Sequence, residues 1–379
     1  MKKSLIVMTV LISAISACGS GYDSIPTSEL PTLIPSSTMP SQDVIEPVSP
    51  TATILPTALI EEALVTVTTA GIELSTAAPD PLHLVFPDAA PAPVSAWRPP
   101  LYTVPWAPTP YDHFYFTRPI AADEVNWPLA NYRYGGVFFE DNVHTGVDIP
   151  APPGTPVLAA GDGKVIWAGY GLYRGVFGDL SDPYGKVVVI QHDFGYQGQG
   201  LFTVYGHLQR IDVPRGQVLS TGDVIGLVGE TGFVTGPHLH FEIRVGAFDF
   251  FSTLNPELWL VPPQGWGILA GRIMNQYDQP LFQKVIYIKN LETGQTWQAI
   301  SYGFGAAKSD PYYQENMAVS DLPAGRYELK LSFFGRWHTL ELDLFPGRVS
   351  YFTFHGIDGF STLPPPTPGS DFDPRDPTQ

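Results

Sequence analysis

The stretch GPHLHFEIRV, residues 236–245, decides how this part of the chain folds. The aliphatic and aromatic residues between and after its two histidines favour a β-strand. Successive side chains of a strand point to opposite faces, so His238 and His240 project from one face, with their Cα atoms roughly 6–7 Å apart. Leu239 points the other way, into apolar packing. The stretch therefore predicts a strand that presents two imidazoles together.

Similar short runs surround this strand and predict an all-β domain over residues 111–262. Val- and Ile-rich segments alternate with Gly-Asp and Asp-Gly turns, and no amphipathic helical pattern of ten or more residues interrupts them. The expected strands lie at residues 164–167, 186–191, 202–205, 224–228 and 238–245. We expect a compact antiparallel sheet.

A second β-rich region covers residues 265–359. Its Gly-x-Ile (271–273), Gln-Pro-Leu (279–281) and Leu-Pro-Ala-Gly-x-Tyr (322–327) elements resemble the small carboxypeptidase-regulatory-like β-sandwich found beside carboxypeptidases and in many exported proteins. The region has no histidine–carboxylate cluster, since His338 and His355 stand alone. We therefore expect it to be an accessory domain that is dispensable for bond cleavage.

The N-terminus predicts export. A basic start and an apolar core of eleven residues are typical of a signal peptide, because spanning a bilayer takes about 20 residues. Residues 15–19 resemble the lipobox of bacterial lipoproteins. That resemblance implies cleavage of residues 1–17 and lipidation of Cys18, the only cysteine, which would anchor the protein outside the cytoplasm on the bacterial cell membrane.

Residues 18–110 are rich in Pro, Thr and Ser and predict a disordered tether, and residues 360–379 predict a disordered tail. The whole chain has 20 Lys and Arg against 37 Asp and Glu, a formal charge of −17. A chain this acidic lacks the surplus of cations that binding to nucleic-acid phosphates needs. Nucleic-acid binding is therefore excluded as an expected function.

Five polar residues of the middle domain predict a zinc site. A catalytic zinc takes three nitrogen or oxygen ligands and keeps one position open. On a straight strand the Cα atoms of His144 and Asp148 would stand roughly 13 Å apart, so we expect a bend at Gly146, through positive φ. The helical His-Glu-x-x-His signature is missing. The candidates are His144, Asp148, His207, His238 and His240.

These residues occur as His-x-x-x-Asp (144–148), Tyr-x-His-Leu (205–208) and Thr-Gly-x-x-Thr-Gly-Pro-His-Leu-His-Phe-Glu (231–242). In this order they resemble the lysostaphin-type (LytM-like) zinc endopeptidases, over roughly residues 111–262. The resemblance implies that one Zn²⁺ is bound by His144, Asp148 and His240, and that His207 and His238 are catalytic. The spacing alone does not say which of His238 and His240 binds the metal.

The family hydrolyses peptide bonds in the stems or cross-bridges of bacterial peptidoglycan, so the resemblance implies this substrate and a role in cell-wall remodelling. The alternative is a non-catalytic relative that binds cell wall or activates another hydrolase. Such relatives lack one or more of the five positions, and all five are present here, which favours an enzyme. We assign no role to Tyr134, and loops 169–185 and 193–201 could shape a substrate groove or be ordinary surface loops.

Overall fold

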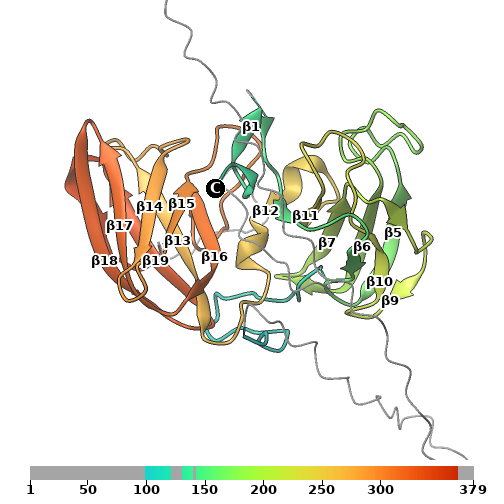
Figure 1. The fold of residues 1–379 in the computed structure, drawn as a ribbon, viewed down its shortest axis with the longest axis horizontal. Helices are drawn as coiled ribbons and strands as arrows, with labels where there is room; N and C mark the ends of the chain where they lie inside the picture. Colours follow the sequence, from blue (N-terminus) through green and yellow to red (C-terminus); the bar gives the residue numbers. More distant parts are fainter. Residues whose placement is uncertain (1–98, 121–129, 140–141, 366–379) are drawn as a thin grey trace, which may run out of the picture. The chain divides into compact units, whose positions relative to one another are not determined.

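A computed structural model describes residues 99–120, 130–139 and 142–365 (Figure 1). All of them fall within one compact unit, Leu82–Gln379. The predicted signal peptide, Cys18 and most of the predicted tether lie outside the described residues. Within the described ranges, no helix is long and apolar enough to cross a membrane.

The first half of the described chain is built from short antiparallel sheets, as the sequence predicts. The largest has strand order β12-β11-β7-β6-β5-β9, and β3 pairs with β11. The strands are β1 (Val137–Phe139), β2 (Asn142–Val143), β3 (Val147–Pro150), β4 (Pro156–Leu158), β5 (Gly163–Gly169), β6 (Val187–Tyr196), β7 (Gln199–Gly206), β8 (Arg210–Ile211), β9 (Val218–Leu219), β10 (Val224–Leu227), β11 (His238–Val245) and β12 (Thr253–Leu254).

Strand β11 lies inside this sheet, between β3 and β12 at one edge and β7 at the other. Its apolar residues Leu239, Phe241 and Ile243 are fully buried in the main hydrophobic core. Because side chains alternate along a strand, the polar residues between them share the opposite face. The predicted all-β fold is confirmed, and this strand begins and ends where the pattern places it.

The second half forms two four-stranded sheets, with orders β16-β13-β19-β20 and β15-β14-β17-β18. Their facing side chains make a second hydrophobic core, so the two sheets pack as layers. All pairs are antiparallel except β13 with β19. The strands are β13 (Trp266–Met274), β14 (Val285–Asn290), β15 (Thr296–Ile300), β16 (Met317–Pro323), β17 (Gly325–Phe333), β18 (Arg336–Leu344), β19 (Val349–His355) and β20 (Gly359–Ser361).

The two halves share a continuous interior. The core of the first half also contains Ile268 and Ala318 of the second. Buried Arg118 pairs with Asp321 across the junction. Four short 3-10 helices complete the described chain, namely η1 (Ala130–Tyr132), η2 (Phe250–Ser252), η3 (Pro256–Leu258) and η4 (Gly356–Asp358).

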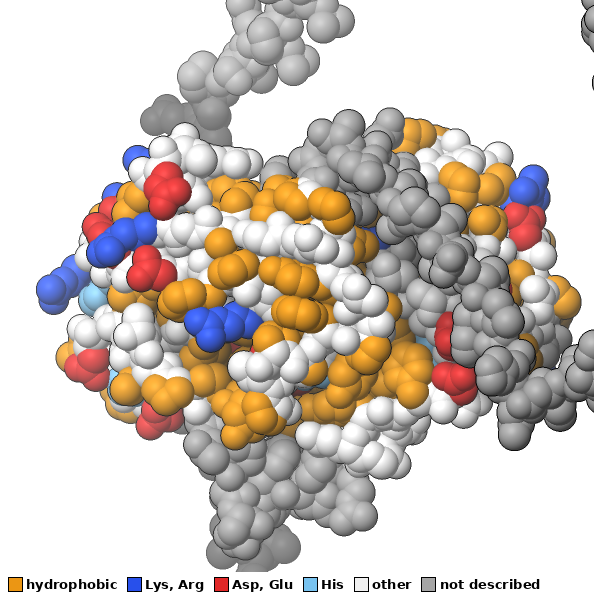
Figure 2. Space-filling view, turned by 90° about the horizontal axis from the view of Figure 1, so that it is seen from below, with side chains coloured by type: hydrophobic (Ala, Val, Ile, Leu, Met, Phe, Trp, Pro, Cys, Tyr) orange, Lys and Arg blue, Asp and Glu red, His pale blue; other side chains and the backbone are white. Residues whose placement is uncertain are grey.

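Both ends of the folded part extend beyond the predicted limits. The indole Nε1 of Trp106, inside the predicted tether, donates a 2.6 Å hydrogen bond to the carbonyl of Gly347. Strand β20 runs to Ser361, inside the predicted tail. Figure 2 shows one face of the molecule, where hydrophobic side chains occupy much of the centre and most charged side chains lie toward the edges.

Candidate metal centre and active site

The pairing of β3 with β11 brings the first candidate residues together. Asp148 lies directly opposite His240 in the register of the two strands. His144 precedes β3, and Gly146 lies between. A Cβ on Gly146 would stand 2.5 Å from the carbonyl oxygen of Phe241 and 2.8 Å from a ring carbon of His240. Gly146 does not have the positive φ that we expected. Glycine is needed here because the two strands approach too closely for a side chain.

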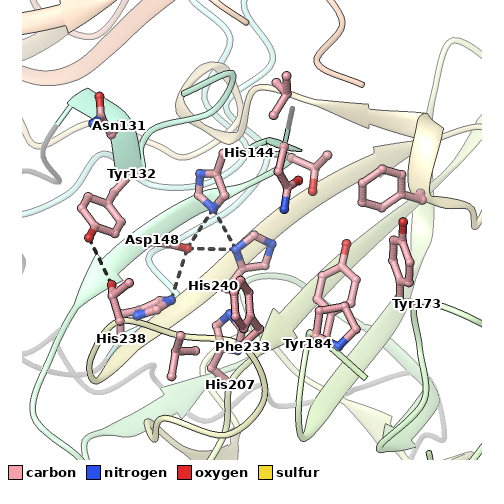
Figure 3. A pocket seen from close by; sticks show the side chains of 17 residues that line it. Asn131, Tyr132, His144, Asp148, Tyr173, Tyr184, His207, Phe233, His238 and His240 are labelled. Atoms are coloured by element: carbon pink, nitrogen blue, oxygen red, sulfur yellow. Dashed lines mark hydrogen bonds and ion pairs between the residues drawn. The ribbon is translucent and has the colours of Figure 1, made fainter. Parts of the chain in front are cut away.

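Three ligand atoms converge at this point (Figure 3). The Oδ1 atom of Asp148 lies 3.0 Å from Nε2 of His144 and 2.9 Å from Nδ1 of His240, and the two nitrogens are 3.0 Å apart. Ligands of a tetrahedral zinc stand roughly 3.3 Å apart, given bonds of about 2.0–2.2 Å. The three residues therefore fit one zinc ion after a small outward movement. Among the described residues they form the one cluster with this geometry.

Hydrogen bonds set the tautomers of the two histidines in this cluster. Nδ1 of His144 donates to the carbonyl of Arg133 at 3.0 Å, and Nε2 of His240 donates to Oε1 of Glu242 at 3.1 Å. A neutral imidazole carries one proton, so its other nitrogen presents a lone pair. Both lone pairs then point at Asp148, which is the arrangement that a metal requires.

Glu242 holds His240 within a buried polar network. The sequence motif included Glu242, but we had assigned it no role. Its carboxylate accepts hydrogen bonds of 2.6 Å from both Thr145 and Tyr184, and one of 2.8 Å from Nε of Arg244. Burial alone would raise the pKa of Glu242, but Arg244 and His240 hold it well below its ordinary value. The carboxylate therefore stays ionised and fixes the His240 ring.

The electrostatics of the cluster favour a cation. Burial would raise the pKa of Asp148, yet His144 and His240 hold it well below its usual range. Burial would lower the pKa of His240, yet Asp148 and Glu242 raise it to about 9. The groups thus stabilise positive charge between them, and a metal ion can take the place of a proton there.

The remaining two histidines stand beside this cluster, with ring centroids 4.8 Å apart. Nδ1 of His207 donates to the carbonyl of Thr231, and Nδ1 of His238 to that of Gly236, both at 2.8 Å. Each Nε2 is left with its lone pair, and Nε2 of His238 lies 3.5 Å from Oδ1 of Asp148. Burial lowers the pKa of His207 to about 3 and that of His238 below 6.5. Both rings are therefore neutral at neutral pH.

A pocket of about 360 Å³ opens onto these residues. Its walls include Asn131 and Tyr132 of η1 on one side, and Tyr173, Tyr184 and Phe233 on the other (Figure 3). Of the described residues that line it, none comes from β13–β20.

The two loops that we singled out have different positions. Loop 169–185 supplies Tyr173 and Tyr184 to the pocket, whereas none of the lining residues comes from loop 193–201. Tyr134 is buried away from the pocket, with its hydroxyl donating to the carbonyl of Thr253 at 2.9 Å. His192 is buried in β6 and does not line the pocket.

Comparison with known proteins agrees with this geometry. The model of peptidase family M23 matches residues 142–250. The chain is 36% identical over 127 residues to the DD-carboxypeptidase/endopeptidase Mpg of Neisseria meningitidis, covering 34% of this chain and 26% of that protein. It is 45% identical over 103 residues to the peptidoglycan DD-endopeptidase ShyA of Vibrio cholerae, covering 27% of this chain and 20% of that protein.

The chain thus spans about a quarter or less of the length of these two relatives. Among solved structures, the catalytic domain of lysostaphin from Staphylococcus simulans is 27% identical, with 35% of this chain and 89% of that chain covered and a TM-score of 0.29. The family match begins at β2, ends in η2, and includes all five candidate residues. Residues 142–250, which carry the five candidate residues, are therefore similar to peptidase family M23.

Proposed function

We propose that this chain is a zinc endopeptidase that hydrolyses peptide bonds in bacterial peptidoglycan. The observation that carries the proposal is the convergence of His144, Asp148 and His240 within 4.8 Å of one another, at the floor of an open pocket. Two further neutral histidines stand beside them. No observation favours the alternative of a non-catalytic relative.

In this proposal His144, Asp148 and His240 hold one zinc ion. When bound, zinc supplies a Lewis acid that polarises a scissile carbonyl and lowers the pKa of water. The carbonyl of Arg133 and the carboxylate of Glu242 keep both imidazoles in the orientation that binding requires. These hydrogen bonds also exclude ring flips that would point a proton at the metal.

His207 and His238 handle protons and developing charge. Their Nε2 atoms carry lone pairs, because each Nδ1–H is committed to a backbone carbonyl. One ring takes a proton at its Nε2 from the attacking water and returns it to the leaving amine. The other donates to the developing oxyanion as the neutral tautomer with its proton on Nε2, which requires that this ring give up its hydrogen bond to the backbone carbonyl. The two rings are buried alike, so the geometry is compatible with either assignment of these two roles.

Peptidoglycan as the substrate is supported by the relatives, since ShyA is named a peptidoglycan DD-endopeptidase and Mpg a DD-carboxypeptidase/endopeptidase. The polymer lies outside the cytoplasmic membrane, so we propose an extracytoplasmic location. We further propose that lipid on Cys18 anchors the chain to the membrane. The Cys18→Ala variant should leave the membrane fraction, and a mature wild-type N-terminus at any other residue would refute the anchor.

Digestion of purified peptidoglycan tests the proposed activity. The zinc-loaded chain should release new peptide termini that mass spectrometry assigns to one type of stem or cross-bridge bond. The His207→Ala variant should retain zinc, since His207 is no ligand in this proposal, but should lose cleavage by at least about 100-fold. Cleavage at the wild-type rate in the His207→Ala variant would exclude its catalytic role.

A further inference from the structure

A second groove, of about 1310 Å³, lies between η1 and the exposed face of the sheet β15-β14-β17-β18. Its volume exceeds that of the metal pocket, and the sequence analysis gave no function to this sheet. Asn131 and Tyr132 of η1 form one side of the groove. Tyr287, Lys289, Lys330 and Trp337 are among the sheet residues that line the other.

Strand register explains why these sheet residues share one face. Tyr287 lies opposite Gln298 on β15 and opposite Lys330 on β17. Two positions further along β14, Lys289 lies opposite Glu328. Residues two apart in a strand point the same way, so these side chains form a polar surface on the outside of the sandwich.

Two aromatic rings stand on this surface. Tyr287 is 42% exposed and Trp337 is 58% exposed, with ring centroids 5.9 Å apart and planes inclined by 58°. A pair of exposed rings of this size is costly to leave in water and is typical of a binding surface. Flat aromatic faces suit the C–H face of a sugar ring, while neighbouring polar groups suit its hydroxyl rim.

The charge on the groove is small. Lys330 pairs with Glu328 at 2.9 Å, so these two side chains largely neutralise each other. Among the sheet residues that line the groove, Lys289 is the remaining charged side chain, and Arg133 on the other side is paired with Glu257. A surface with aromatic rings, amides and little net charge matches a neutral polysaccharide better than a strongly anionic peptide.

The groove continues from the metal pocket. Asn131 and Tyr132 line both, and the Tyr132 hydroxyl lies 3.1 Å from that of Thr235 at the pocket wall. A polymer that places a peptide in the metal pocket therefore reaches the sheet across η1. The substrate of the proposed reaction is such a polymer, with peptides attached along sugar strands.

We propose that the outer face of β14, β15, β17 and β18 binds the glycan strand of the polymer whose peptide enters the metal pocket. This inference rests on the proposed function for the identity of the polymer. The sandwich then acts as a substrate-binding domain, with Trp337 and Tyr287 as the platform for sugar rings. It orients the polymer relative to the metal cluster.

The test uses the full chain and peptide-free glycan strands released from purified peptidoglycan by an amidase. The carboxylate that this cleavage leaves on each muramic acid residue is amidated, so that the strands are uncharged like the glycan of the intact polymer. Binding is measured by calorimetry for the wild type and for Trp337→Ala, Tyr287→Ala and Phe334→Ala. The last is the matched control, because Phe334 is 80% exposed on the β17–β18 turn and does not line the groove. Circular dichroism and melting temperature establish that each variant is folded.

We expect the wild type and Phe334→Ala to bind the strands with equal affinity, and Trp337→Ala and Tyr287→Ala to bind roughly fivefold more weakly. The ratio of cleavage of intact peptidoglycan to cleavage of a soluble stem peptide should fall in the same two variants. Equal binding by all four proteins, or no binding by a wild type that cleaves peptidoglycan, would overturn the proposal. A wild type that binds glycan and cleaves nothing would support the groove and refute the proposed activity.

Discussion

Arg133 contacts His144 through its backbone, because the Arg133 carbonyl accepts the hydrogen bond from Nδ1 of His144 at 3.0 Å. The guanidinium of the same residue pairs with buried Glu257. Glu257 also accepts a 2.6 Å hydrogen bond from the backbone N–H of Ser320, in β16 of the second half. The segment that orients a candidate metal ligand is therefore anchored to both halves of the fold.

This relationship predicts the effect of Glu257→Gln. The substitution removes the counter-charge of buried Arg133, which should lower the free energy of unfolding by about 3 kcal/mol. Because the Arg133 carbonyl orients His144, zinc affinity should fall roughly tenfold. Urea unfolding and competition with a chelator measure the two effects.

The control is Glu341→Gln, which breaks an exposed pair with Arg326. In this variant the free energy of unfolding and the zinc affinity should both stay close to those of the wild type. Unaltered zinc affinity in a destabilised Glu257→Gln would show that the anchor is only structural.

A second prediction concerns the close approach of β3 and β11. Gly146→Ala places a methyl group 2.5 Å from the carbonyl oxygen of Phe241. The methyl group should force β3 and β11 apart, which should lower the free energy of unfolding by about 2 kcal/mol and reduce zinc binding. Gly200→Ala is the control, since its Cβ would meet the Phe202 ring at an ordinary 3.5 Å. Crystallographic or thermal-shift data in which both variants match the wild type would contradict this account of Gly146.

The third prediction uses His192, which is remote from the metal cluster. Its Nδ1 donates to the carbonyl of Asp162 at 2.9 Å, and burial lowers the pKa of His192 from 6.5 to about 4. Below pH 6.5 the unfolded chain gains a proton that the folded chain does not, so stability falls as pH drops from 6.5 to 4. The loss should reach roughly 3 kcal/mol.

The His192→Gln variant isolates this effect, because glutamine keeps a hydrogen-bond donor and does not titrate. The difference in unfolding free energy between wild type and variant should decrease from pH 7 to pH 4. A pH-independent difference would mean that His192 titrates normally in the folded chain.

The fourth prediction concerns the shared interior. The core around Trp259 includes Ile268 and Ala318, which a chain ending at Pro262 would lack. We therefore expect such a truncation to expose this core and to aggregate or unfold, rather than to act as the independent domain that the sequence suggested. Far-ultraviolet circular dichroism and gel filtration measure this. If the truncated chain is folded and monomeric and still cleaves a stem peptide, this prediction is wrong and the second half is dispensable for cleavage.

Much of the fold was predictable from residue patterns. The alternation of residues 238–245 matches β11, and residues 224–228 match β10 to within one residue. The two-residue strands β8 and β9 were missed, because two residues are too few to show the alternation of apolar and polar side chains that marks a strand. Such short strands form only because neighbouring strands pair with them. The joining of the two halves was missed because it depends on pairs far apart in the chain, such as Arg118 with Asp321.

The five candidate residues were predictable because they sit in short motifs whose order resembles a known family. Their supporting contacts were not. Tyr184 lies 58 positions from Glu242, and no local pattern connects them. Glu242 itself had a signal, since it follows His240 by two positions and so shares its face of β11. His192 is another example of contacts without a local pattern, since its burial depends on β7, where the Thr203 hydroxyl donates a 2.8 Å hydrogen bond to Nε2 of His192.

The central claim is that His144, Asp148 and His240, and not His238, hold the metal. The most direct measurement is the zinc content of purified, folded His240→Ala and His238→Ala, determined by mass spectrometry beside the wild type. The account predicts one zinc per wild-type chain, nearly one in His238→Ala, and almost none in His240→Ala. Full zinc in His240→Ala, or loss of zinc in His238→Ala alone, would contradict it.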